Sequence, residues 1–276
     1  VMACRQTGFA MLASTNPQEA MDLGAVAHLT TIKARVPFLH FFDGFRTSHE
    51  YQKVACWDYK DLAEMVDWDA INNFRRSSLN PEHPAQRGTA QNPDVFFQAK
   101  EASNKAYDAI PEVVEEYMEK VSAMTGRDYK LFNYYGDPQA DRVIIAMGSV
   151  CDAAKETIDY MMAKGEKVGL VQIHLYRPFK EDAFLAAIPE TATKIAVLDR
   201  DKENGAIGEP VYLDVLAAYY RAGKQATIVG GRYGLGSKDT TPAQIVAVYE
   251  NTTKEKFTIG IVDDVTNLSL ETGAPI

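Results

Sequence analysis

The pattern of apolar and polar positions predicts a strand, a helix and a strand at the start of the chain. Apolar runs at 9–14 and 37–42 flank residues 16–33, where apolar side chains recur every three or four positions. This spacing is typical of an amphipathic helix, and Asn16 followed by proline is typical of its start. A strand, helix and strand with short connections form a parallel βαβ unit. Two parallel strands do not make a stable sheet, so we expect residues before Val1 to complete it.

The middle of the chain is predicted to be helical apart from one long loop. Helical spacing of apolar residues covers 59–78, 94–107 and 111–125. Residues 80–93 are rich in Pro, Asn, Gln and Gly and have no such spacing. An ordered loop of this length in a compact domain is usually functional or held at an interface.

From Gly136 onward, short apolar runs alternate with helical segments. The runs that predict strands are 142–147, 167–173, 194–198, 226–230 and 257–262. The segments that predict helices are 152–163, 181–187, 209–222 and 242–249. Five strands alternating with four helices predict a self-contained parallel α/β sandwich. We therefore place a domain boundary near residue 130, which divides the chain into residues 1–129 and 130–276.

Composition and charge exclude several classes of protein. Hydrophobic residues make up 46% of the chain and charged residues 24%, which favours a folded core over disorder. The net charge of −9 argues against a general nucleic-acid binder. No apolar run approaches the roughly 18–20 residues that cross a bilayer, so we expect no membrane partner. Cys4, Cys56 and Cys151 form no CxxC pair, and such spacing is typical of inert thiols in a reducing cytoplasm.

The polar segment after the second predicted strand is the most informative stretch of the chain. The apolar run 37–42 breaks into DGFRTSHE at 43–50. In open α/β sheets, loops at the carboxyl ends of parallel strands line the ligand crevice. His49 lies between Arg46 and Glu50 in the sequence, and such neighbours can tune a histidine pKa for proton transfer. The alternative is a solvated turn in which an Asp and a Ser cap the backbone.

Other candidate motifs are weaker. The glycine-rich segment 231–238 lacks the spacing of a phosphate-binding P-loop, and we expect it to contact another part of the protein. The turn at 147–152 leads onto a helix, where Ser149 and Asp152 are expected to cap the backbone. The charged run 199–205 predicts an exposed loop or a salt-bridged interface. The five histidines show no metal-ligand spacing, and we predict no metal site.

Six motifs, taken together and in order, resemble the pyruvate:ferredoxin (flavodoxin) oxidoreductases. They are RQTG at 5–8, HFFDGFRTSHE at 40–50, NPEHPAQRGTAQNPD at 80–94, LYRPF at 175–179, VLDRDKE at 197–203 and GGRYGLGSK at 230–238. The resemblance covers nearly the whole chain but only part of the family enzyme. It implies the latter part of a thiamine diphosphate pyrimidine-binding domain, as a parallel βαβ remnant. A five-stranded transketolase C-terminal-like three-layer α/β sandwich would follow.

The resemblance also implies an activity for the parent enzyme. Such an enzyme oxidatively decarboxylates pyruvate to acetyl-CoA and CO2 and passes electrons to ferredoxin or flavodoxin. It uses thiamine diphosphate, Mg2+, [4Fe–4S] clusters and coenzyme A, and it is expected to be a homodimer.

The family's Tyr-Pro-x-Thr-Pro segment, catalytic Glu and carboxylate-binding Arg would lie before Val1, and its diphosphate- and cluster-binding domains after Ile276. The expected partner of this chain is therefore the rest of the same polypeptide. We predict no catalytic residue and no bound cofactor in the chain alone. The candidate positioning or interface residues are Asp43, Arg46, Thr47, His49 and Glu50. The alternative function is a non-catalytic assembly module for dimerisation and domain orientation.

Overall fold

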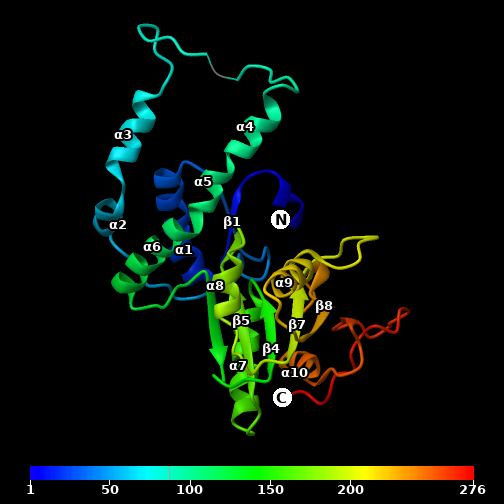
Figure 1. The fold of residues 1–276 in the computed structure, drawn as a ribbon. Helices are drawn as coiled ribbons and strands as arrows, with labels where there is room; N and C mark the ends of the chain where they lie inside the picture. Colours follow the sequence, from blue (N-terminus) through cyan, green and yellow to red (C-terminus); the bar gives the residue numbers. More distant parts are fainter. Residues whose placement is uncertain (87) are drawn as a thin grey trace.

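Apolar runs and helical segments alternate in the computed structural model much as the pattern predicts (Figure 1). The structure describes residues 1–86 and 88–276. The strands are β1 (Ala10–Ala13), β2 (Phe38–Phe41), β3 (Phe132–Gly136), β4 (Arg142–Ala146), β5 (Val168–Ile173), β6 (Leu175–Arg177), β7 (Lys194–Asp199), β8 (Thr227–Arg232) and β9 (Lys256–Thr258). The helices are α1 (Pro17–Ala34), α2 (Tyr59–Met65), α3 (Trp68–Arg76), α4 (Phe96–Ala102), α5 (Asn104–Asp108), α6 (Ile110–Thr125), α7 (Val150–Met162), α8 (Glu181–Ala186), α9 (Pro210–Arg221) and α10 (Pro242–Glu250).

A three-stranded sheet of order β2-β1-β6 contains the predicted βαβ unit. β1 and β2 are parallel and α1 connects them, as predicted. α1 begins as the sequence indicates, because the Asn16 side chain accepts the Glu19 N–H at 3.0 Å. The third strand, β6, pairs antiparallel with β1 and comes from beyond residue 130. The pattern did not predict β6, because this short strand follows β5 almost directly and its apolar run continues that of β5.

The larger sheet has six strands in the order β3-β5-β4-β7-β8-β9. The prediction of five strands omitted β3, which pairs antiparallel with β5 at the edge of the sheet. β3 is only partly buried and reads FNYYG, so it lacks the apolar run that marks the inner strands. The other five strands are mutually parallel, as predicted. β9 ends at Thr258, before the predicted end at 262, and Gly260 turns the chain with φ +83°.

Helices cover both faces of this sheet and make three layers. α7 and α10 pack together on one face, in a core that includes Ile144 and Ala146 of β4. α9 covers the other face, in a core that includes Val143 and Ile145. This second core continues into α1 and α6, so one apolar interior joins the two predicted parts of the chain.

The helical middle segments are more broken than predicted. The periodic stretch 59–78 divides into α2 and α3 because Val66 is extended, with φ −68° and ψ 131°. Asp67 then starts a new helix by accepting the Ala70 N–H at 2.8 Å. The stretch 94–107 likewise divides into α4 and α5.

The long loop predicted at 80–93 contains only an isolated bridge between Asn80 and His83 in its described part. Arg87 of that prediction lies outside the described residues. Over the described ranges, no helix has both the length and the apolar character that a bilayer span needs.

Candidate functional site

The polar loop 43–50 follows β2 and connects the two parts of the chain through Asp43. One oxygen of the Asp43 carboxylate accepts the Ser149 backbone N–H at 2.6 Å, at the start of α7. The other oxygen lies 2.9 Å from the Arg200 guanidinium, directly after β7. The turn before α7 therefore binds an anionic group, which is a carboxylate of the same chain. Ser149 occupies the N-cap position without a side-chain cap, so the cap expected from its hydroxyl was wrong.

Arg46 ties the same loop to the glycine-rich segment after β8. Its guanidinium pairs with the Asp239 carboxylate at 2.6 Å and donates a hydrogen bond to the Ser237 carbonyl. Segment 231–238 thus contacts the other part of the chain, as we expected from its sequence. The Asp239 side chain is 77% exposed, so water screens this ion pair strongly.

The remaining candidate residues divide into one buried anchor and an exposed rim. Thr47 is buried and its hydroxyl donates to the Thr15 carbonyl at 3.1 Å. The His49 ring is exposed, lies 2.9 Å from the Ser48 hydroxyl through Nδ1, and packs against Phe45 at 5.0 Å.

Glu50 is also exposed. In the described part of the chain, no ion pair joins it or Arg46 to His49. The arrangement of His49 between a cation and a carboxylate, which the sequence favours, is therefore not a contact in the structure.

A hollow of about 320 Å3 lies where the loop meets the carboxyl ends of the larger sheet. Its charged lining residues are Arg46, Glu50, Asp152, Arg200, Lys238 and Asp239. Two of its three cations, Arg46 and Arg200, are already paired with carboxylates of the chain. These two ion pairs hold loop 43–50 against the segments that follow β7 and β8. They leave little positive charge in the hollow for a ligand carboxylate.

Sequence reasoning missed the central part of a buried polar cluster beside this loop. The Glu19 carboxylate of α1 accepts hydrogen bonds from the Thr15 N–H at 2.8 Å and from the Gln172 amide at 3.0 Å. His174 Nε2 lies 3.3 Å from Glu19, and its Nδ1 donates to the Lys130 carbonyl at 2.8 Å. Burial raises the Glu19 pKa, but the hydrogen bond and charge of His174, with the other donors, lower it to about 2.

One signal in the sequence points to this cluster. Gln172 is the polar residue of the buried strand β5, which otherwise reads as an apolar run, and His174 directly follows that strand. Side chains two positions apart along extended backbone point to the same side, and Gln172 and His174 both contact Glu19. His174 has a structural, hydrogen-bonded role, since its ring contacts the Gln172 amide and the Lys130 carbonyl.

A second buried cluster holds α1 one turn further along, at Asp22. The Asp22 carboxylate is fully buried and accepts hydrogen bonds from Arg127 at 2.6 and 3.2 Å and from the Tyr129 hydroxyl at 2.6 Å. Burial, together with the neighbouring Asp22 carboxylate, raises the Tyr129 pKa, so this hydroxyl remains a donor. Both clusters therefore fasten α1 to the residues around 130.

Asp199 departs from the expectation of an exposed charged loop at 199–205. It is buried at the end of β7 and accepts the Val211 and Tyr212 N–H groups at 3.1 and 3.0 Å, at the start of α9. Burial raises its pKa to about 7, while these two hydrogen bonds act in the opposite direction. The following residue, Arg200, makes the interface contact that the charge alternation indicated.

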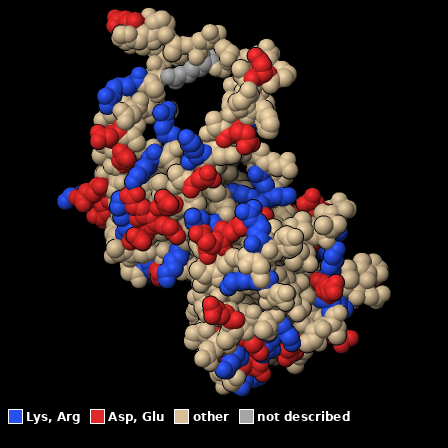
Figure 2. All heavy atoms as spheres, viewed as in Figure 1, with Lys and Arg blue, Asp and Glu red and all other residues tan. Residues whose placement is uncertain are grey.

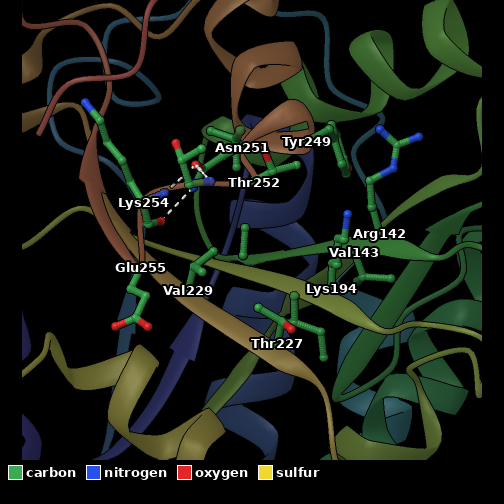
Figure 3. Close-up of a pocket in the computed structure, with 14 residues that line it drawn as sticks. Arg142, Val143, Lys194, Thr227, Val229, Tyr249, Asn251, Thr252, Lys254 and Glu255 are labelled. Carbon is green, nitrogen blue, oxygen red and sulfur yellow. Dashed lines mark hydrogen bonds between the residues drawn. The ribbon is translucent and has the colours of Figure 1, made fainter.

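Another hollow of about 320 Å3 lies at the opposite, amino ends of the parallel strands (Figure 3). Arg142, Lys194 and Thr227, which line it, open β4, β7 and β8. The Arg142 guanidinium is paired with Glu166, and the Asn251 side chain bonds the backbone of Lys254. Open α/β sheets bind ligands at the other, carboxyl ends of their strands. In the described part of the chain, no group of three or more His, Cys, Asp or Glu side chains could hold a metal ion.

Comparison with known proteins gives two family matches in succession. Residues 1–119 match the model of the thiamine diphosphate-binding part of pyruvate flavodoxin/ferredoxin oxidoreductases. Residues 140–245 match the model of pyruvate:ferredoxin oxidoreductase core domain II. A solved 2-oxoglutarate:ferredoxin oxidoreductase from Magnetococcus marinus aligns with a TM-score of 0.49 and 16% identity, over 86% of this chain and 41% of that one.

Comparison with curated enzymes, over nearly the whole of this chain, agrees with these two family matches. The pyruvate:ferredoxin oxidoreductase of Moorella thermoacetica is 58% identical over 98% of this chain, which covers 24% of that enzyme. The pyruvate-flavodoxin oxidoreductase of Enterobacter agglomerans is 57% identical over 97% of this chain, which covers 23% of that enzyme. The chain thus spans about a quarter of the length of these curated relatives. Its motifs, its two successive family matches and these identities show that it belongs to the pyruvate:ferredoxin (flavodoxin) oxidoreductase family.

Proposed function

We propose that this chain is part of a 2-oxoacid oxidoreductase that oxidatively decarboxylates pyruvate to acetyl-CoA and CO2. The parent enzyme passes the electrons to ferredoxin or flavodoxin. The observation that carries this proposal is the 58% identity to the Moorella thermoacetica enzyme over 98% of the chain. Pyruvate is preferred over other 2-oxoacids because the relatives from Moorella thermoacetica, Enterobacter agglomerans and Klebsiella pneumoniae are all named for pyruvate.

Within the parent, we assign this chain a positioning role. The ion pairs of Asp43 and Arg46 fix loop 43–50 against the larger sheet, at the carboxyl ends of its strands. A loop fixed in this way can hold a neighbouring cofactor crevice closed, since such crevices lie at these strand ends. We retain the division near residue 130 as a proposal, with the pyrimidine-binding part before it and the transketolase C-terminal-like part after it. The gap between the two family matches supports that position.

The described residues do not fit a complete cofactor site. Thiamine diphosphate, where bound, stabilises a carbanion on the substrate. The turn before α7 could donate to a diphosphate, but Asp43 already occupies it. Asp239 places a carboxylate beside Lys238, where a phosphate would otherwise bind. We therefore propose that the complete parent holds thiamine diphosphate, Mg2+, the [4Fe–4S] clusters and coenzyme A, and that this chain alone binds none of them.

The partners of the chain follow from the same family. We propose that it works as part of one long polypeptide and that the parent is a cytoplasmic homodimer. The three cysteines are free thiols, which is consistent with a reducing compartment. Burial raises the pKa of the Cys151 thiol well above its ordinary value, so this residue is unsuited to cluster ligation.

The second candidate function is a non-catalytic assembly module. The ion pairs at loop 43–50 and the two buried clusters favour it for the isolated chain, because these charged groups bind each other. The two proposed functions are compatible with each other in the parent enzyme but not in the isolated chain.

The test compares the full parent and the 276-residue chain for pyruvate- and coenzyme A-dependent reduction of a viologen dye. We expect activity in the parent and none in the chain. A parent that oxidises another 2-oxoacid but not pyruvate would overturn the substrate. Turnover by the chain alone would overturn the positioning role.

A further inference from the structure

Thr15 joins loop 43–50 to the buried cluster around Glu19. It lies between β1 and α1 and is 2% exposed. Its backbone N–H donates to Glu19 at 2.8 Å, its hydroxyl oxygen accepts from the Gln172 amide at 2.6 Å, and its carbonyl accepts from the Thr47 hydroxyl at 3.1 Å. The three polar groups of Thr15 are therefore bonded to three different elements, which are α1, β5 and the loop.

The orientation of the Gln172 amide is fixed by its other neighbours. The amide nitrogen lies 3.0 Å and 3.1 Å from the two Glu19 oxygens and 2.9 Å from His174 Nε2. An amide oxygen in this place would face the Glu19 carboxylate, and the two groups would repel each other because both only accept hydrogen bonds. Gln172 therefore presents its N–H groups to this side and donates one of them to Thr15, which is 157 positions away.

The contacts of the Arg46 side chain lie at the surface and do not fix the loop by themselves. Figure 2 shows acidic and basic side chains interspersed over the face that it draws, and water and salt screen ion pairs at such a surface. The pair of Arg46 with Asp239 is of this exposed kind, since the Asp239 side chain is 77% exposed.

The backbone on both sides of Arg46 is anchored by contacts that are less exposed. Asp43, three positions earlier, binds the Ser149 backbone and the Arg200 guanidinium. Thr47, the next residue, is 4% exposed and donates to the Thr15 carbonyl. Arg46 and Thr15 both line the hollow at the carboxyl ends of the larger sheet. The position of Thr15 therefore determines where the loop holds Arg46 at this hollow.

We propose that Gln172 is a positioning residue for the 2-oxoacid reaction of the parent enzyme. Its amide holds Thr15, Thr15 holds Thr47, and Thr47 fixes the backbone that carries Arg46. A residue of the larger sheet thus controls the loop of the smaller sheet through a buried route. The inference deepens the positioning role proposed above and rests on that part of the proposed function.

The test is a double-mutant cycle in the full parent enzyme, with Thr47→Val and Gln172→Met. Each variant removes hydrogen bonds of the route, and each should lower kcat/KM for pyruvate by about fivefold or more. The loss should fall mainly on kcat, because a misplaced loop disturbs the reacting geometry. The double variant should be no worse than the weaker single variant, whereas independent effects would multiply to about 25-fold.

Two controls separate positioning from packing. Thr47→Ser keeps the hydroxyl and should stay within about twofold of the wild-type kcat/KM. Thr157→Val is matched to Thr47→Val, because Thr157 is buried in α7 and its hydroxyl donates to the Ala153 carbonyl at 2.7 Å. It loses a buried hydrogen bond outside the route and should leave the kinetics unchanged. Should Gln172→Met not fold, Thr15→Val takes its place in the cycle, since it removes the same bond from the other side.

Amide exchange of the parent enzyme, followed by mass spectrometry, reports the loop without any substrate. The peptide that covers 43–50 should exchange about fivefold faster or more in Thr47→Val and Gln172→Met than in wild type. Thr157→Val should leave this exchange unchanged. Strands β4 and β7 should keep their wild-type exchange in every variant, which distinguishes a loosened loop from a general loss of folding.

Losses that multiply in the double variant would overturn the inference, as would normal kinetics in either single variant. Loop exchange that stays at the wild-type rate in Thr47→Val and Gln172→Met would overturn it as well. A wild-type parent that does not oxidise pyruvate would overturn the proposed function instead, because the exchange measurement tests the route from Gln172 to the loop without substrate.

Discussion

The carboxylate of Asp43 lies 2.6 Å from the backbone nitrogen of Ser149, although 106 positions separate the two residues. This contact joins the loop after β2 to the start of α7. It is possible because Gly148, which precedes Ser149, carries no side chain. A Cβ atom at Gly148 would lie 2.8 Å from an Asp43 oxygen. The polar loop therefore packs directly against the backbone at Gly148 and Ser149, where β4 of the larger sheet leads into α7.

Gly148→Ala is expected to destabilise the chain by about 2–3 kcal/mol, through backbone strain and displacement of Asp43. Gly148 has φ +82°, a conformation that alanine adopts only at a cost. Gly165→Ala is the matched control, because Gly165 has φ +86° and nothing within 4 Å of its added Cβ. Urea denaturation of both variants measures the difference. Equal losses would show that the contact with Asp43 adds nothing.

Arg46→Lys is expected to lower kcat/KM for pyruvate in the parent about tenfold, equivalent to ~1.4 kcal/mol. A lysine keeps the charge but cannot hold both Asp239 and the Ser237 carbonyl in one plane. The melting temperature should hardly change, because the pair is exposed at Asp239.

Asp239→Asn separates two ways in which Arg46 could act. If Arg46 positions the loop, this variant should lower kcat/KM as Arg46→Lys does. A loss in Arg46→Lys alone would mean that the guanidinium itself contacts substrate. Unchanged kinetics in both variants would make the loop purely structural.

The fold was predictable wherever local pattern decides it. The alternation of apolar runs and helices after residue 136 is visible in the sequence, and so is the break from apolar to polar at Asp43. β3 was missed because a half-exposed edge strand has no apolar run, and β6 because it is short. The end of α2 was missed because the apolar spacing continues through Val66, whose extended backbone leaves no mark in that spacing.

The site was predictable only in its position along the chain. Composition at 43–50 indicated a functional or interface loop, but no local pattern identifies Ser149 and Arg200 as the partners of Asp43. The cluster around Glu19 is of the same kind, since β1, α1 and β5 meet there only in the folded chain. Glu19 itself read as an ordinary first-turn acid of a helix.

Glu19→Gln is expected to cost roughly 3 kcal/mol of stability at neutral pH, from the lowered pKa of this carboxylate. Its pKa falls from 4.5 to about 2 in the folded chain, so the folded state favours the ionised form. The stability that this charge contributes is present above pH 4.5 and is lost as the pH falls toward about 2. The difference in unfolding free energy between wild type and Glu19→Gln should therefore become smaller as the pH falls over that range.

Denaturant titrations of wild type and Glu19→Gln at several pH values measure this difference. Glu64→Gln, at an exposed carboxylate of α2, is the control and should change stability by less than about 0.5 kcal/mol. If the difference in unfolding free energy stays constant from neutral to acid pH, Glu19 stabilises the fold through the shape of its side chain rather than through its charge.

Residues 130–276 are expected to fold alone, whereas residues 1–129 are not. The larger fragment keeps all six strands of its sheet, with α7 and α10 on one face and α9 on the other. The smaller fragment loses β6 from its sheet and the Gln172 and His174 partners of Glu19. It would then leave the apolar face of α1 in water and an uncompensated carboxylate beside it.

Amide exchange on each fragment and on the whole chain measures the difference, with β1 as the internal reference because it is fully buried in the whole chain. We expect slow exchange in β4, β5 and β7 of the larger fragment, and fast exchange in β1 of the smaller one. Strong protection throughout 1–129 would show that this part is an independent domain, and that its contacts across residue 130 are not needed for folding.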